Sequence, residues 1–98
     1  LNVAIGLLRA RLNASNEWQF MLHDVQRTLM VVMSHVATPS SVRHLNPNVL
    51  LDDLSAQCES WIDAMTLLMA DGEGYFILPG GTEISALCHQ ARVAARRA

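Results

Sequence analysis

Apolar side chains recur at alternating steps of four and three residues along most of the chain, which is the spacing of one face of an α-helix. The clearest run lies between residues 18 and 36 and consists of Trp18, Leu22, Val25, Leu29, Val32 and Val36. A second run lies between residues 50 and 68 and consists of Leu50, Leu54, Cys58, Trp61, Met65 and Leu68. Shorter runs occupy residues 1–12 and 84–98. This pattern predicts a helical protein without a β-sheet.

Turn-forming residues divide these runs into four predicted helices, which cover residues 1–12, 18–37, 48–70 and 83–98. Residues 38–47 are predicted to form a loop, and residues 75–81 an extended apolar loop that ends in a tight turn at two glycines. Thr82 is placed to cap the last helix, and Ser15 or Asn16 the second. Four helices without a sheet pack naturally as an antiparallel bundle, so the predicted fold class is all-α.

The second helix is expected to be buried on more than one side, because Met21, Met33 and Ala37 widen its apolar stripe. Apolar residues make up 51% of the 98 residues and charged residues 16%, which argues for a folded chain rather than a disordered one. This low charge predicts that some apolar surface faces a partner chain. No run is long enough to span a membrane, and a net charge of −2 argues against a general nucleic-acid binder.

The basic residues are all arginines, and three of the seven lie within the last seven positions of the chain. Ser85, His89, Arg92 and Arg96 are spaced by four, three and four residues and would form one polar stripe on the last helix. Arginine suits bidentate contact with phosphate, so this stripe together with Arg97 could hold a polyphosphate. Alternatively, these arginines only stabilise a helix C-terminus and pair with nearby acids.

Phe76 lies between glycines, outside any amphipathic stripe, where it could form the flat wall of a ligand pocket. Alternatively, it anchors the loop onto the bundle. The four histidines lack the i,i+4 spacing of a metal-binding helix, so no metal ligand is predicted; a metal site would need assembly across helices. Cys58 and Cys88 both lie on apolar stripes and are expected to be buried thiols.

Several segments of the chain resemble one known family. The string Phe76-Ile77-Leu78-Pro79-Gly80-Gly81-Thr82, followed by Leu87-Cys88-His89-Gln90-Ala91-Arg92 and by Arg96-Arg97-Ala98, resembles the signature FILPGG, LHxAR and CRRAER of PduO-type ATP:cob(I)alamin adenosyltransferases. Residues 1–7 resemble the family's DELNAAIGLA segment, and Val25-Gln26 followed by Leu29 resembles its IQxxLF helix. The chain differs at Met33-Ser34-His35, where the family often has Gly-Ala-Glu, and at Ala95, where the family has Cys.

The resemblance implies a five-helix bundle with ferritin-like up-down packing that assembles as a homotrimer with active sites between subunits. Residues 1–98 would be a single helical-bundle domain that holds the first four helices, without the N-terminal ATP loop and the last helix. The implied enzyme is a transferase that moves the 5′-deoxyadenosyl group of ATP, bound with Mg²⁺, onto the cobalt of cobalamin and releases triphosphate. A reductase and an adenosylcobalamin-dependent mutase are implied partners. The implied location is the cytoplasm of a bacterium or the mitochondrial matrix of a eukaryote.

The resemblance also implies roles for individual residues. Phe76 would occupy the lower face of the corrin and exclude the lower axial ligand of cobalt, and His89 would also contact cobalamin. Arg96 and Arg97 would contact the ATP phosphates, and Arg92 would pair with an Asp of a neighbouring subunit. Phe76 and Arg96 are the predicted catalytic residues. Two alternatives to the enzyme are a non-catalytic corrinoid carrier with the same bundle and a structural helical oligomer without a ligand.

Overall fold

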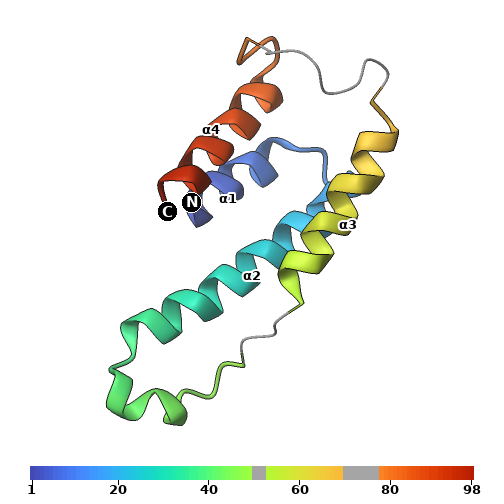
Figure 1. The fold of residues 1–98 in the computed structure, drawn as a ribbon. Helices are drawn as coiled ribbons and strands as arrows, with labels where there is room; N and C mark the ends of the chain where they lie inside the picture. The colour runs from blue at the N-terminus through green and yellow to red at the C-terminus, as the bar shows by residue number, and fades with distance from the viewer. Residues whose placement is uncertain (50–52, 70–77) are drawn as a thin grey trace.

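In a computed structural model of the protein, residues 1–49, 53–69 and 78–98 are described, and they form four α-helices and one 3₁₀-helix (Figure 1). The α-helices are α1 (Asn2–Arg11), α2 (Trp18–Ala37), α3 (Leu54–Leu67) and α4 (Glu83–Arg97), and the 3₁₀-helix η1 (Ser40–Leu45) follows α2. These three ranges contain no β-strand, so the predicted all-α class is confirmed.

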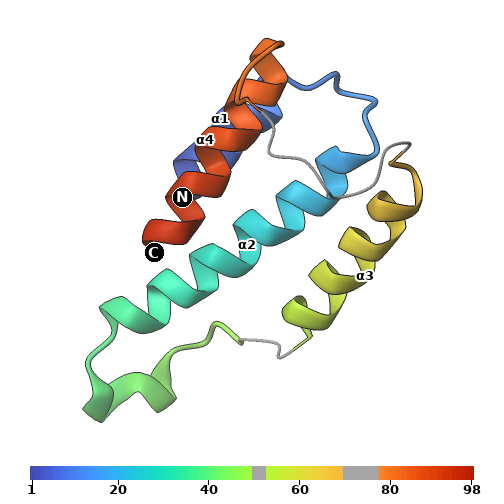
Figure 2. The same cartoon turned by 45° about the horizontal axis from the view of Figure 1, so that its top comes forward.

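The longest helix, α2, lies between α1 and α3, and α4 packs on α1 (Figures 1 and 2). Asn2 and Arg9 of α1 contact Gln26 and Gln19 of α2, respectively, so these two helices run antiparallel. Antiparallel neighbours joined by short connections are typical of helical bundles. None of the described helices has the length and hydropathy needed to cross a membrane.

The described core is small and is centred on α1. Ile5, Leu8 and Leu12 are the buried apolar side chains among the described residues. The prediction that α2 is buried on more than one side is wrong for this structure, because α2 has no fully buried residue. Phe20 and Val36 are both 77% exposed, since α1 and α3 cover only part of the helix surface.

The third helix is shorter than the predicted range of residues 48–70, since α3 begins at Leu54 and ends at Leu67. Asn48 and Val49 are described and are not helical. The backbone N–H of Asn48 donates to Asn46 Oδ1 at 2.9 Å, and the Asn48 carbonyl lies 2.8 Å from His35 Nε2. These bonds hold the chain after Pro47 against the end of α2 in a non-helical conformation.

The predicted loop of residues 38–47 contains η1, which the sequence analysis missed. Asn46 Nδ2 donates to Ser34 Oγ and to Thr38 Oγ1, both at 3.2 Å, so one amide ties the end of η1 to the end of α2. Asn48 Nδ2 also donates to Ser34 Oγ at 3.2 Å. A segment fixed by such side-chain bonds can adopt a short 3₁₀ turn without strong apolar periodicity.

The start of α4 agrees with the prediction. Gly80 and Gly81 have φ values of +120° and +89°, which only glycine adopts easily. Thr82 Oγ1 accepts a hydrogen bond from the backbone N–H of Ser85 at 3.1 Å, which caps the helix. This turn directs α4 back along α1.

Candidate functional site

Three of the polar residues predicted on α4 line a cavity together with the start of α1. This open cavity of about 700 Å³ is lined by residues of both helices. Leu1 and Ala4 form its α1 side, and Pro79 contributes from the segment before α4. The α4 side consists of His89, Gln90, Arg92, Val93, Ala94, Arg97 and Ala98.

The packing of α1 on α4 fixes this cavity. The buried Ile5 and Leu8 lie on α1, and Ala91 and Ala94 provide small, partly buried positions on α4. At the other end of the same helix pair, Arg11 and Glu83 form an ion pair with a separation of 3.3 Å. Both side chains of this pair are exposed, so the apolar packing contributes more than the ion pair.

The structure brings together three of the predicted site residues. His89, Arg92 and Arg97 line the same cavity, whereas Arg96 is exposed on α4 and does not line it. Phe76 lies outside the described residues. Among the described residues, no Asp or Glu side chain lines the cavity, so the guanidinium groups of Arg92 and Arg97 make this lining electropositive. A cavity of this kind is suited to an anionic ligand group.

His89 has a buried polar atom that faces no protein partner. Its side chain is partly buried, and Nδ1 has no hydrogen-bond partner among the described residues. A buried ring nitrogen without a partner is unusual in a folded protein. His89 lines the cavity as a residue, and its buried Nδ1 is a polar atom that the described residues leave without a partner.

The alternative interpretation of the α4 arginines was that they pair with acidic residues. Within residues 1–49, 53–69 and 78–98, Arg92, Arg96 and Arg97 form no ion pair. Arg96 and Arg97 do lie in the last turn of α4, where a positive charge is favourable to the helix dipole. The described contacts therefore leave all three guanidinium groups available to a ligand or a partner chain.

A hydrogen-bond network behind the cavity was not predicted. The guanidinium of Arg9 on α1 donates to Gln19 Oε1 at 3.0 Å and to Gln26 Oε1 at 2.8 Å. Gln26 also contacts Asn2, the first residue of α1. The sequence contains two signs of this network. Gln19 and Gln26 are seven residues apart on one helix face, and a glycine, Gly6, lies within the helix that they contact.

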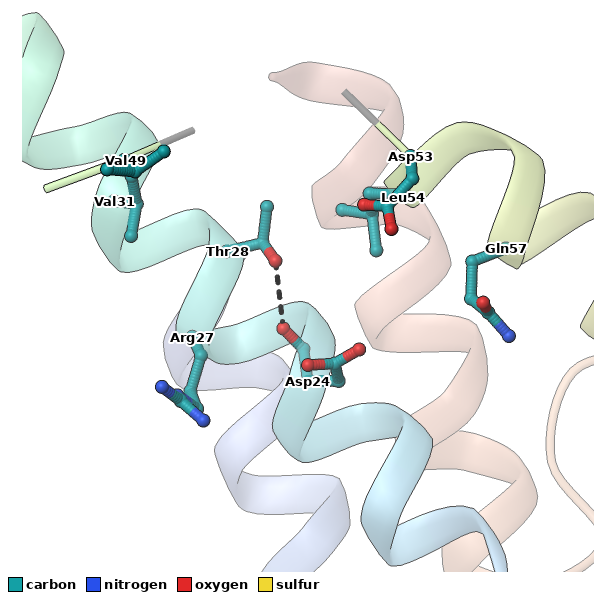
Figure 3. A pocket seen from close by; sticks show the side chains of 8 residues that line it. All are labelled: Asp24, Arg27, Thr28, Val31, Val49, Asp53, Leu54 and Gln57. Carbon is teal, nitrogen blue, oxygen red and sulfur yellow. Dashed lines mark hydrogen bonds between the residues drawn. The ribbon is translucent and has the colours of Figure 1, made fainter. Parts of the chain in front are cut away.

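A second cavity of about 290 Å³ lies between α2 and the start of α3 (Figure 3). Its lining consists of Asp24, Arg27, Thr28, Val31, Val49, Asp53, Leu54 and Gln57. Thr28 Oγ1 donates to the backbone carbonyl of Asp24 at 3.1 Å. No sequence prediction fell on this cavity. In the described part of the chain, no three His, Cys, Asp or Glu side chains are grouped so that they could hold a metal ion.

The two cysteines are half-buried, one on α3 and one on α4. Burial raises the pKa of the Cys58 thiol, and the negative charge of Asp24 raises it further. Burial alone raises the pKa of the Cys88 thiol. Both groups therefore stay protonated near neutral pH, and neither is an activated nucleophile.

Comparison with known proteins identifies the family of the chain. The family model described as cobalamin adenosyltransferase matches residues 1–98. A corrinoid adenosyltransferase of Mycobacterium leprae (strain TN) is 30% identical over 105 residues, which cover 99% of this chain and 52% of that protein. The chain thus spans about half the length of this relative. No solved structure gives a significant match. Because the family model covers all 98 residues, the chain belongs to the cobalamin adenosyltransferase family.

Proposed function

We propose that the protein transfers the 5′-deoxyadenosyl group of ATP to the cobalt of cob(I)alamin. Family membership supports a reaction on a corrinoid, and the Mycobacterium leprae relative is named for the same class of activity. The observation that carries the proposal is that His89, Arg92 and Arg97 line one electropositive cavity beside α1. These residues come from the part of the sequence that resembles the family signature.

The proposed reaction breaks the bond between C5′ of the ribose and the α-phosphate oxygen of ATP. The electron pair of Co(I) forms the new cobalt–carbon bond, and triphosphate leaves with the bond electrons. Negative charge therefore grows on the leaving oxygen, where guanidinium groups stabilise it. We assign this role to Arg97, which lines the cavity, and to Arg96, which is exposed on the same helix turn. ATP enters as its Mg²⁺ complex, so the ion is part of the substrate.

The corrinoid is the second substrate in this proposal. Phe76 would cover its lower face and exclude the axial ligand, and His89, which lines the cavity, would also contact it. Arg92 would pair with an acidic residue of a neighbouring subunit in a homotrimer, which its exposure on α4 permits. A reductase that supplies Co(I) completes the proposed set of partners, and residues 1–98 form one helical domain of the enzyme.

Steady-state adenosylation of cob(I)alamin by the purified protein tests the proposal, with Arg97→Ala as the variant and Arg43→Ala as its matched control. Arg43 is an exposed arginine on η1 that does not line the α1–α4 cavity. Loss of a charge-assisted contact with phosphate should raise the KM for ATP roughly 10- to 100-fold in Arg97→Ala. The control should keep the wild-type KM.

The products of the same assay separate the proposal from its alternative. Formation of adenosylcobalamin and tripolyphosphate in equal amounts supports the transferase. A wild-type protein that binds adenosylcobalamin tightly but never consumes ATP would instead be a corrinoid carrier. Equal KM values for Arg97→Ala and Arg43→Ala would remove Arg97 from the ATP site.

A further inference from the structure

Two reciprocal hydrogen bonds between Asn2 and Gln26 join the first turn of α1 to α2. Gln26 Nε2 donates to the backbone carbonyl of Asn2 at 3.2 Å, and Asn2 Nδ2 donates back to the Gln26 carbonyl at 3.4 Å. Arg9 donates to Gln26 Oε1 at 2.8 Å. Because a guanidinium can only donate, it fixes the oxygen of the Gln26 amide toward Arg9 and turns the amide nitrogen toward Asn2.

Gly6 provides the space that this contact needs. A Cβ atom at Gly6 would lie 3.1 Å from Gln26 Nε2, which is tighter than an ordinary van der Waals contact. A glycine within a helix is less stable than an alanine. The close approach of Gln26 explains why α1 nevertheless has a glycine at position 6.

The turn that Gln26 fastens is also one wall of the candidate site. Leu1 and Ala4 line the α1–α4 cavity on the side opposite to His89, Arg92 and Arg97. A shift of this turn would change the shape of the cavity. Among the described residues, the hydrogen-bond partners of the Gln26 side chain are Asn2 and Arg9, which both belong to α1. Gln26 therefore reaches the site through α1.

We propose that Gln26 is a positioning residue for adenosyl transfer, which holds the first turn of α1 at the distance from α4 that ATP binding requires. This inference rests on the proposed function, and it adds a residue that lies outside the cavity. The resemblance to the IQxxLF helix includes Gln26 but assigns it no role.

A second glutamine on α2 offers a matched control. Gln19 accepts from the same Arg9 side chain at 3.0 Å, but its Nε2 donates to the Arg9 carbonyl at 2.8 Å, at the end of α1 far from the cavity. Gln26→Glu and Gln19→Glu each keep an acceptor for Arg9 and lose one amide donor to α1. The two variants therefore perturb the same helix pair by the same chemical change at opposite ends.

The kinetics of the two variants test the inference. Gln26→Glu is expected to raise the KM for ATP about tenfold with kcat within about twofold of wild type. The new carboxylate repels the backbone carbonyl of Asn2, which shifts the first turn of α1 but leaves the reacting groups in place. Gln19→Glu should leave the KM within about twofold of wild type, although the Gln19 amide nitrogen bonds three carbonyls and its loss should lower the melting temperature at least as much as Gln26→Glu does. Gly6→Ala should also raise the KM, because the added methyl group displaces the Gln26 amide. The melting temperature of this variant should not fall, since alanine stabilises a helix relative to glycine and offsets the lost contact.

Equal KM values for Gln26→Glu and Gln19→Glu would overturn the inference and leave the proposed function intact. If the wild-type protein shows no adenosylation, the proposed function fails, and hydrogen exchange then decides whether Gln26 holds the turn. The Ile5 N–H donates to the Leu1 carbonyl at 3.0 Å within that turn. Faster exchange of this amide in Gln26→Glu than in Gln19→Glu supports the positioning role, and equal exchange contradicts it.

Discussion

Cys58 and Cys88 show how a residue on an apolar stripe acquires its chemistry from its surroundings. Each is partly covered by neighbouring helices, and the resulting desolvation disfavours a thiolate. Asp24 reinforces this effect at Cys58 through like-charge repulsion. The sequence predicted fully buried thiols, whereas the structure leaves both half-buried. The described core consists of Ile5, Leu8 and Leu12, and neither cysteine belongs to it.

The raised pKa of each thiol makes stability depend on pH in the alkaline range. Above the ordinary thiol value of 9.0, the unfolded chain loses these protons before the folded chain does, so the free energy of unfolding should fall as pH rises. Below that value the thiols are protonated in both states and contribute no pH dependence. Urea unfolding at pH 8 and at pH 10 measures this fall, and the double variant Cys58→Ala, Cys88→Ala should show a smaller one. An identical fall in the double variant would contradict the prediction.

The grouping of two predicted site residues on α4 could be foreseen from sequence because their spacing is local. His89 and Arg92 are three residues apart on α4 and do line one cavity. The same spacing placed Arg96 on this stripe, but Arg96 does not line the cavity, whereas the neighbouring Arg97 does. The contacts of Gln26 could not be predicted, because its partners lie 24 and 17 residues away in sequence.

At the scale of elements, helices with local start and stop signals were predicted closely. The observed bounds of α1, α2 and α4 differ from the predicted ranges by no more than one residue. The segment after α2, with η1 and the non-helical Asn48, is held by bonds from Asn46 and Asn48 to Ser34, which lies 12 and 14 residues away in sequence. A periodic pattern contains no information about such bonds, so this segment was predicted as a plain loop that leads directly into a helix.

The cap of α4 gives a prediction at this scale. Thr82→Ala removes the acceptor for the Ser85 N–H and should lower the free energy of unfolding by about 1 kcal/mol. Thr82→Ser keeps a hydroxyl in the same position and should stay close to wild type. Chemical denaturation of both variants measures the difference. Equal losses in the two variants would mean that the methyl group of Thr82, and not its hydroxyl, stabilises the start of α4.

The whole molecule is extended for its length. The radius of gyration is 15.8 Å and the longest extent is 50 Å, whereas a compact domain of this length has a radius of gyration of about 13 Å. Large apolar side chains are exposed on several helices, with Val3 at 86% and Leu67 at 87%. Exposed apolar surface on this scale is typical of chains that associate. The proposed homotrimer would cover part of that surface.

The described core is too small to account for a stable isolated chain, which leads to a prediction for the assembly. If folding and self-association are coupled, dilution favours the unfolded chains by mass action. For three chains of this size, the melting temperature should rise by about 5 °C for each tenfold increase in protein concentration. Calorimetric scans over a hundredfold range measure the slope, and sedimentation equilibrium over the same range counts the chains. A melting temperature independent of concentration, together with a monomer mass of 10.8 kDa, would contradict the trimer and would require the exposed apolar faces of α1 and α3 to be stable in water.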